Sequence, residues 1–135
     1  PDKKRLFYTW GLSNSFEINN DSKKELNCKK KSKKNEINAV AYSDNPKPEI
    51  SELYKKYKIT NFKRMKSSLK FCVIASGEYD FYAAEPRASE WDIAAGHAIL
   101  QNAGGIITDF DNKEIFYGKK NFENPSIILK RNINL

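Results

Sequence analysis

Two predicted helix starts in this 135-residue chain carry polar side chains that could bind charged groups. Ser67 and Ser68 precede a helical pattern at 69–76, and Lys70 stands in its first turn. Backbone N–H groups at a helix start, two hydroxyls and an ammonium group together favour a phosphate-like anion. The same residues also fit an ordinary capped helix with a solvated lysine, so their spacing leaves both interpretations open.

The second helix start places a carboxylate where a cation could bind. Asp92 follows Ser89 by three residues, the spacing of a capping box, and Gly104 and Gly105 end the predicted helix. Asp92 also suits Mg²⁺, which takes oxygen ligands from one or two carboxylates and completes its shell with water and phosphate. Capping and metal binding are both open for Asp92 on these residues alone.

The helix that begins at Ser89 is predicted to be a core element that lies close to a sheet. Small and aliphatic residues form a stripe on it at helical spacing. They are Ala94, Ala95, Ala98, Ile99 and Ala103.

The other segments alternate between strand and helix patterns, which predicts an α/β structure with helices packed on a mixed sheet. Residues 49–57 read as a helix, and an aromatic hairpin is expected at 5–10 and 15–19. Further strands are predicted at 36–43, 58–65, 79–83, 106–110, 114–117 and 126–130. We expect residues 36–135 to form one α/β domain, and residues 1–35 to be a hairpin and a Lys-rich loop that belong to a neighbouring layer.

The net charge of +7 is distributed unevenly along the chain. Residues 1–66 contain 17 basic and 8 acidic side chains, whereas residues 67–135 contain 7 and 9. Most of the excess lies at Lys23, Lys24, Lys29, Lys30, Lys31, Lys33 and Lys34. A solvated loop is the ordinary interpretation, and a phosphate-attracting patch is the alternative. Because this loop lacks the interleaved aromatic residues of a single-strand binding surface, nucleic acid is not the expected partner.

Composition limits the remaining classes. No apolar run reaches the ~20 residues of a membrane-spanning helix, and the N-terminus has no secretory signal pattern. We expect a cytoplasmic protein, and peripheral contact with the inner membrane is left open. Cys28 and Cys72 offer neither a disulfide framework nor metal-ligand spacing, so both are expected to be free thiols.

Two motifs resemble a known family. The run from Trp91 to Gly96, with the later Ala103-Gly104-Gly105, resembles the C-terminal signature of the inositol monophosphatase superfamily. Residues 67–72, followed by Gly77-Glu78 and Tyr82, are similar to the 3′(2′),5′-bisphosphate nucleotidase branch. That branch hydrolyses adenosine 3′,5′-bisphosphate. The resemblance implies the layered αβαβα sugar-phosphatase fold, of which this chain resembles the C-terminal half.

The resemblance also implies roles for single residues. Asp92 corresponds to an aspartate that binds a catalytic Mg²⁺, and Ser67 and Lys70, with Ser68 beside them, fall where the nucleotidases contact the non-scissile phosphate and the ribose. The branch often has an arginine where this chain has Ala84. Arg87 lies three residues further on, and whether it replaces that arginine is open.

An upstream Asp-Pro-x-Asp-Gly-Thr motif, which supplies most metal ligands in the family, does not occur in this sequence. The resemblance therefore implies the C-terminal part of a Mg²⁺-dependent nucleotidase that depends on a missing N-terminal half in cis, and that is inactive as the isolated chain. The alternatives are an inositol monophosphatase or sugar-bisphosphatase of the same superfamily, and a non-catalytic basic nucleic-acid-binding domain.

Overall fold

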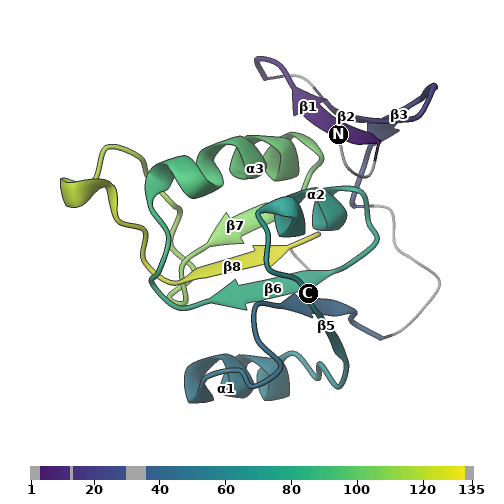
Figure 1. Cartoon of the computed structure of the whole chain (residues 1–135). Coiled ribbons are helices and arrows are strands. Elements are labelled where there is room, and N and C mark those ends of the chain that lie inside the picture. The colour runs from purple at the N-terminus through teal and green to yellow at the C-terminus, as the bar shows by residue number, and fades with distance from the viewer. Residues whose placement is uncertain (1–3, 13, 30–35, 133–135) are drawn as a thin grey trace.

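A five-stranded mixed sheet forms the centre of the protein, in the computed structural model, which describes residues 4–12, 14–29 and 36–132. Its strands follow the order β5-β4-β6-β8-β7 (Figure 1). β4 runs parallel to β5 and β6, whereas β8 runs antiparallel to β6 and β7. The strands are β4 (Ala39–Ala41), β5 (Phe62–Arg64), β6 (Phe81–Ala84), β7 (Ile106–Thr108) and β8 (Ile127–Lys130). The predicted mixed sheet is confirmed, with strands shorter than the sequence patterns.

Helices cover both faces of this sheet, as expected. Helix α1 (Pro48–Lys56) lies on one face, and α2 (Leu69–Ala75) and α3 (Glu90–Asn102) lie together on the other (Figure 1). Strand β6 serves both sides because successive side chains point to opposite faces. Tyr82 and Ala84 pack in the cluster that contains α2 and α3 side chains, whereas Phe81 and Ala83 pack with Ile50 of α1.

A second sheet lies beyond α3 and consists of β1 (Arg5–Thr9), β2 (Ser15–Asn19) and β3 (Ser22–Leu26), all antiparallel. Both strands of the predicted hairpin are confirmed. The prediction of a loop for Lys23 and Lys24 is wrong, because these residues belong to β3. Leu26, which is 2% exposed, anchors this strand in the core, and the Lys23 ammonium lies 4.5 Å from the centre of the Phe16 ring.

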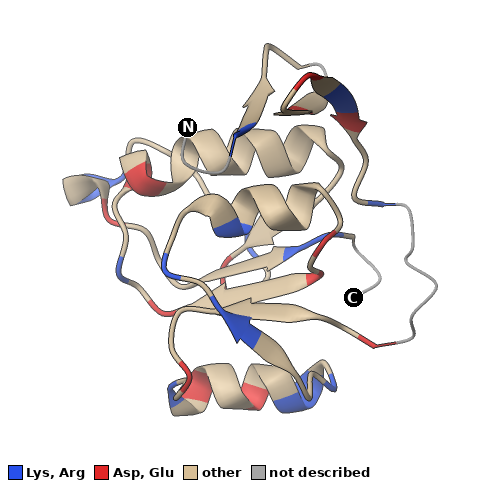
Figure 2. Cartoon of the chain, turned by 45° about the vertical axis from the view of Figure 1, so that its right-hand side comes forward, with Lys and Arg blue, Asp and Glu red and all other residues tan. Residues whose placement is uncertain are grey.

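Lys29 of that segment lies in a turn after β3 and is exposed, and the last four lysines, Lys30, Lys31, Lys33 and Lys34, lie outside the described residues. The domain boundary predicted after residue 35 lies next to these lysines and stays a prediction. Basic and acidic side chains are interspersed over much of the ribbon, and α1 carries both signs (Figure 2).

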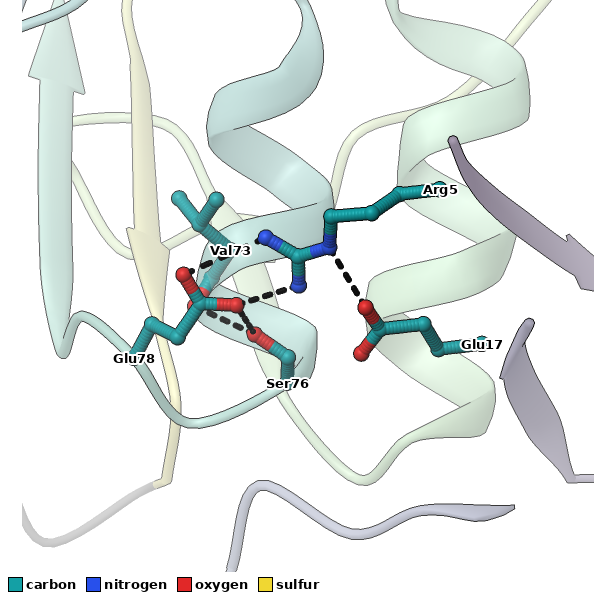
Figure 3. A network of polar contacts seen from close by, with 5 residues as sticks. All are labelled: Arg5, Glu17, Val73, Ser76 and Glu78. Atoms are coloured by element: carbon teal, nitrogen blue, oxygen red, sulfur yellow. Dashed lines mark hydrogen bonds and ion pairs between the residues drawn. The ribbon is translucent and has the colours of Figure 1, made fainter. Parts of the chain in front are cut away.

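An ion-pair network joins the small sheet to the end of α2 (Figure 3). Arg5 of β1 donates to Glu17 of β2, which is 7% exposed, and to Glu78 in the turn after α2. The Ser76 hydroxyl donates to Glu78 at 2.8 Å. One guanidinium thus holds the edge of the small sheet against the end of α2.

Close helix packing accounts for a glycine in α3. A Cβ atom placed on Gly96 would lie 2.6 Å from the Phe71 ring of α2, so only glycine allows this approach. The predicted stripe is wrong in part, because Ala94 and Ala95 are exposed. The buried positions on α3 are instead Glu90, Ile93, Ile99 and Leu100.

The strand predicted at 114–117 is also wrong. This segment makes a single bridge, between Glu114 and Thr108, and then leaves the sheet. Ile115 is buried, but Phe116 and Tyr117 are 68% and 46% exposed, so no buried face stabilises further pairing. Among the described residues, no helix is long and apolar enough to span a bilayer.

Candidate functional site

A cavity of about 440 Å³ opens where α2 and α3 begin, beside the ends of β4 and β6. Ligands of α/β proteins commonly bind at the carboxyl ends of strands. All the side chains predicted to bind metal or substrate line this cavity, although 25 positions separate the first from the last. They are Ser67, Ser68, Lys70, Arg87 and Asp92. The fold therefore brings the two predicted helix starts to one place.

Lys70 is a buried cation in this cavity, with 6% of its surface exposed. Its ammonium group donates to the carbonyl oxygens of Met65 at 3.1 Å and Ser67 at 2.6 Å. It also lies 4.9 Å from the centre of the Tyr82 ring. Burial, and secondly the positive charge of Arg87, lower the pKa of Lys70 to about 8. An anion in the cavity would offset both effects.

The start of α2 is tightly closed by its own chain. The Leu69 N–H donates to the Ser67 hydroxyl at 3.1 Å, and the Lys70 and Phe71 N–H groups donate to the Ser67 and Ser68 carbonyls. Ser67 thus caps this turn as predicted, whereas the Ser68 side chain makes no capping bond. Attraction for an anion consequently falls to the basic side chains and not to these N–H groups.

Arg87 lies against an aromatic side chain at the cavity wall. Its guanidinium carbon is 3.4 Å from the centre of the Tyr42 ring. The Arg87 guanidinium, by a hydrogen bond and by its charge, lowers the pKa of Tyr42. Ala84 lines the same cavity and is 2% exposed. Both residues therefore face the cavity, and Arg87 supplies a positive charge there, whereas Ala84 carries no charge.

Asp92 caps α3 and faces the same cavity. One of its carboxylate oxygens accepts the Ser89 N–H at 2.8 Å, which confirms the capping interaction. A carboxylate has lone pairs for further contacts, so capping and metal binding are chemically compatible at Asp92.

The described residues do not complete a metal site around Asp92. Within residues 4–12, 14–29 and 36–132, no group of three or more His, Cys, Asp and Glu side chains could hold a metal ion. Glu85 also lines the cavity, but it pairs with Lys47 at 3.3 Å. The donor set that fits Mg²⁺ is thus limited to one carboxylate, and affinity for this ion needs several oxygen ligands together.

Sequence reasoning missed three residues of the cavity: Tyr42, Lys66 and Asn124. Tyr42 follows β4 and Lys66 follows β5, so the ends of neighbouring strands were the available signal. Asn124 stands in a segment with no periodic pattern, and nothing in the sequence marked it. Trp91, which is 69% exposed, also lines the cavity.

Comparison with known proteins assigns this geometry to a family. The pattern of the inositol monophosphatase family matches residues 4–134, nearly the whole chain. This chain belongs to the inositol monophosphatase family. Its five-stranded sheet, flanking helices and small antiparallel sheet are those of the family's solved structures.

This chain is similar to members of the bisphosphate nucleotidase branch, and the matched region is only part of their length. The 3′(2′),5′-bisphosphate nucleotidase CysQ of Salmonella typhimurium is 43% identical over 60 residues, which cover 44% of this chain and 24% of that enzyme. The crystal structure of CysQ from Bacteroides thetaiotaomicron superimposes with a TM-score of 0.77 and 25% identity, over 96% of this chain and 55% of that one. The chain thus spans about half the length of this solved relative.

Other solved members share the fold alone. SaIMPase-II with bound inositol monophosphate superimposes with a TM-score of 0.64 at 19% identity, over 90% of this chain and 48% of that one. The superfamily, the branch and the partial length predicted from the sequence are confirmed by these matches.

Proposed function

We propose that this chain forms the substrate-binding part of a metal-dependent phosphatase that removes the 3′-phosphate of adenosine 3′,5′-bisphosphate. One observation carries the proposal: this chain, a member of the family, has three cationic side chains and a helix-capping carboxylate around a single cavity. The cations are Lys66, Lys70 and Arg87, and the carboxylate is Asp92. In a ligand with two phosphate groups, one could contact the cations, and the other could reach a metal ion bound at Asp92.

The cationic region would hold the non-scissile phosphate. Lys70 is fixed by two carbonyl oxygens and keeps a third N–H for a ligand, since an ammonium group has three donors. Arg87 stacks one face on the Tyr42 ring and offers the N–H groups along its edge to phosphate oxygens. Ser67 and Ser68, next to Lys70, supply hydroxyls at the same wall.

The scissile phosphate would lie toward Asp92. This carboxylate would supply one ligand to Mg²⁺, and the other ligands would come from residues outside this chain, in an N-terminal half of the parent protein. The bound ion would neutralise phosphate charge and polarise a water molecule. Because the described residues contain no group of three or more side chains that could hold a metal ion, the chain by itself would bind the substrate and would not hydrolyse it.

Calorimetry with the 135-residue chain, without metal, tests the binding role. We expect adenosine 3′,5′-bisphosphate to bind more tightly than inositol 1-phosphate. Lys70→Met and Arg87→Met should each weaken binding by about 10-fold or more, since a charge-assisted hydrogen bond is lost. Lys55→Met, on the exposed face of α1, is the matched control and should change nothing.

A phosphate-release assay tests whether hydrolysis needs residues outside this chain. With Mg²⁺ we expect no enzymatic turnover by the chain alone, and rapid turnover at this nucleotide by the full-length parent. Tighter binding of inositol 1-phosphate would favour a cyclitol phosphatase of the same family, consistent with the inositol monophosphate bound in the SaIMPase-II structure. Turnover by the isolated chain at an ordinary enzymatic rate would refute the dependence on other residues.

A further inference from the structure

The side-chain amide of Asn124 is buried without a partner at the wall of the same cavity. Asn124 is 4% exposed and lines the cavity together with Asp92. Neither its Oδ1 nor its Nδ2 atom has a hydrogen-bond partner in the part of the chain that the structure describes. Buried amide groups are nearly always paired, because an unpaired one loses its water contacts without compensation.

The backbone at Asn124 is fixed by contacts at this residue and in the segment before it. The Asn124 N–H donates to the Ala88 carbonyl at 3.0 Å, and Glu123 forms a β-bridge with Ser89. Further back, the Glu90 carboxylate accepts the N–H groups of Gly118 and Lys119, each at 2.9 Å. The segment is thereby attached to the first turn of α3, so Asn124 is held beside the turn that carries Asp92.

The chemistry of the amide narrows what it can bind. A phosphate oxygen accepts hydrogen bonds and would repel Oδ1, and the cavity already has cations for phosphate groups. The exposed Trp91 offers an aromatic face for a planar ring at a site open to solvent. Because both amide atoms are buried, only a small group that both donates and accepts could pair with them. A ring hydroxyl beside an oxygen carried by the neighbouring ring carbon is such a group.

We propose that the Asn124 amide recognises the ring hydroxyl next to the phosphate-bearing carbon of the ligand. The hydroxyl donates to Oδ1, and the adjacent oxygen on the ring accepts from Nδ2. This inference rests on the proposed function, since it assumes a phosphorylated sugar or cyclitol in the cavity. In adenosine 3′,5′-bisphosphate the group is the ribose 2′-hydroxyl, and in inositol 1-phosphate it is a neighbouring ring hydroxyl.

A comparison of two ligands on two proteins isolates this contact. Calorimetry measures the affinity of the wild-type chain for adenosine 3′,5′-bisphosphate and for its 2′-deoxy analogue, and the pair is repeated with Asn124→Leu. We expect the deoxy analogue to bind the wild type about five-fold more weakly, the effect of one net hydrogen bond. Asn124→Leu should bind both ligands equally. Asn61→Leu, at an exposed site outside the cavity, should keep the five-fold difference.

Thermal unfolding without ligand separates recognition from a structural role. Replacing an unpaired buried amide by an apolar group of similar size removes no hydrogen bond, so the midpoint of Asn124→Leu should equal or exceed that of the wild type. Asn124→Ala repeats the ligand comparison if the leucine does not fit. A lower midpoint together with an unchanged five-fold ratio would assign the amide a structural role and overturn the proposal.

The failure of the proposed function gives a different result. If the wild type binds inorganic phosphate as tightly as both nucleotides, the anion site stands and hydroxyl recognition is refuted. If the five-fold difference occurs with inositol 1-phosphate and its 2-deoxy analogue only, Asn124 keeps its role and the nucleotide assignment fails. If no phosphorylated compound binds, both proposals are refuted.

Discussion

Raising the pH should weaken phosphate binding through Lys70. The pKa of this buried ammonium group is about 8, lowered from 10.5 chiefly by burial and further by Arg87. If only the charged form attracts an anion, the apparent dissociation constant should rise about tenfold between pH 7 and pH 9. A phosphate monoester is already almost fully ionised at pH 7, so the ligand contributes little to this change.

The same shift has a consequence for stability, with a defined sign. Between pH 8 and pH 10.5 the unfolded chain binds more protons at Lys70 than the folded chain, so folding stability rises with pH in this window. The full effect of the shift is about 3 kcal/mol relative to a variant without this group. Binding and stability therefore change in opposite directions as Lys70 loses its proton.

Both quantities can be measured on the wild-type chain and on Lys70→Met. Calorimetry with adenosine 3′,5′-bisphosphate, whose phosphate groups are monoesters, gives the affinity from pH 7 to pH 9, and urea denaturation gives the free energy of unfolding from pH 7 to pH 10.5. The tenfold change in affinity and the rise in stability should both be absent from Lys70→Met. An affinity that is constant with pH in the wild type, or the same slope in both proteins, would refute the role given to Lys70.

Three further predictions concern the elements around the cavity. Asp92→Asn in the full-length parent should abolish phosphate release, yet cost at most about 1 kcal/mol of stability by denaturation, since asparagine can still accept the Ser89 N–H; ordinary turnover would reduce Asp92 to a cap. Gly96→Ala should destabilise the chain by about 1–3 kcal/mol, because its Cβ would overlap the Phe71 ring, whereas Ala95→Ser at an exposed position should not. Arg5→Met should lower the unfolding free energy by about 1–3 kcal/mol, because the buried Glu17 carboxylate loses its partner. Glu78→Gln should lower the unfolding free energy less than Arg5→Met does, and equal losses would contradict this ranking.

The fold was largely predictable because its elements carry local signals. The Ser89 cap, the closing glycines and the apolar runs each determine the start or end of an element, and the structure confirms those elements. Two of the errors concern strand pairing, which the residue pattern of one segment does not determine. Lys23 and Lys24 form a strand because β2 lies beside them, and residues 114–117 do not because they lack a buried face.

The site was predictable only where a motif exists. Ser67, Lys70 and Asp92 belong to family signatures, and the structure brings them to one cavity. Tyr42 and Asn124 enter the cavity through the sheet topology, which places the end of β4 and the segment before β8 beside the helix starts. Such proximity depends on long-range packing, which residue spacing does not encode.

The arrangement of charge suggests why binding and hydrolysis would separate in this chain. The three cavity cations need no other partner to attract a phosphate, and Lys70 is held in place by backbone carbonyls. A divalent cation, in contrast, needs several oxygen ligands at once, and Asp92 provides one. Anion affinity is therefore a property that these residues can have by themselves, whereas hydrolysis, under the proposed function, would depend on further ligands.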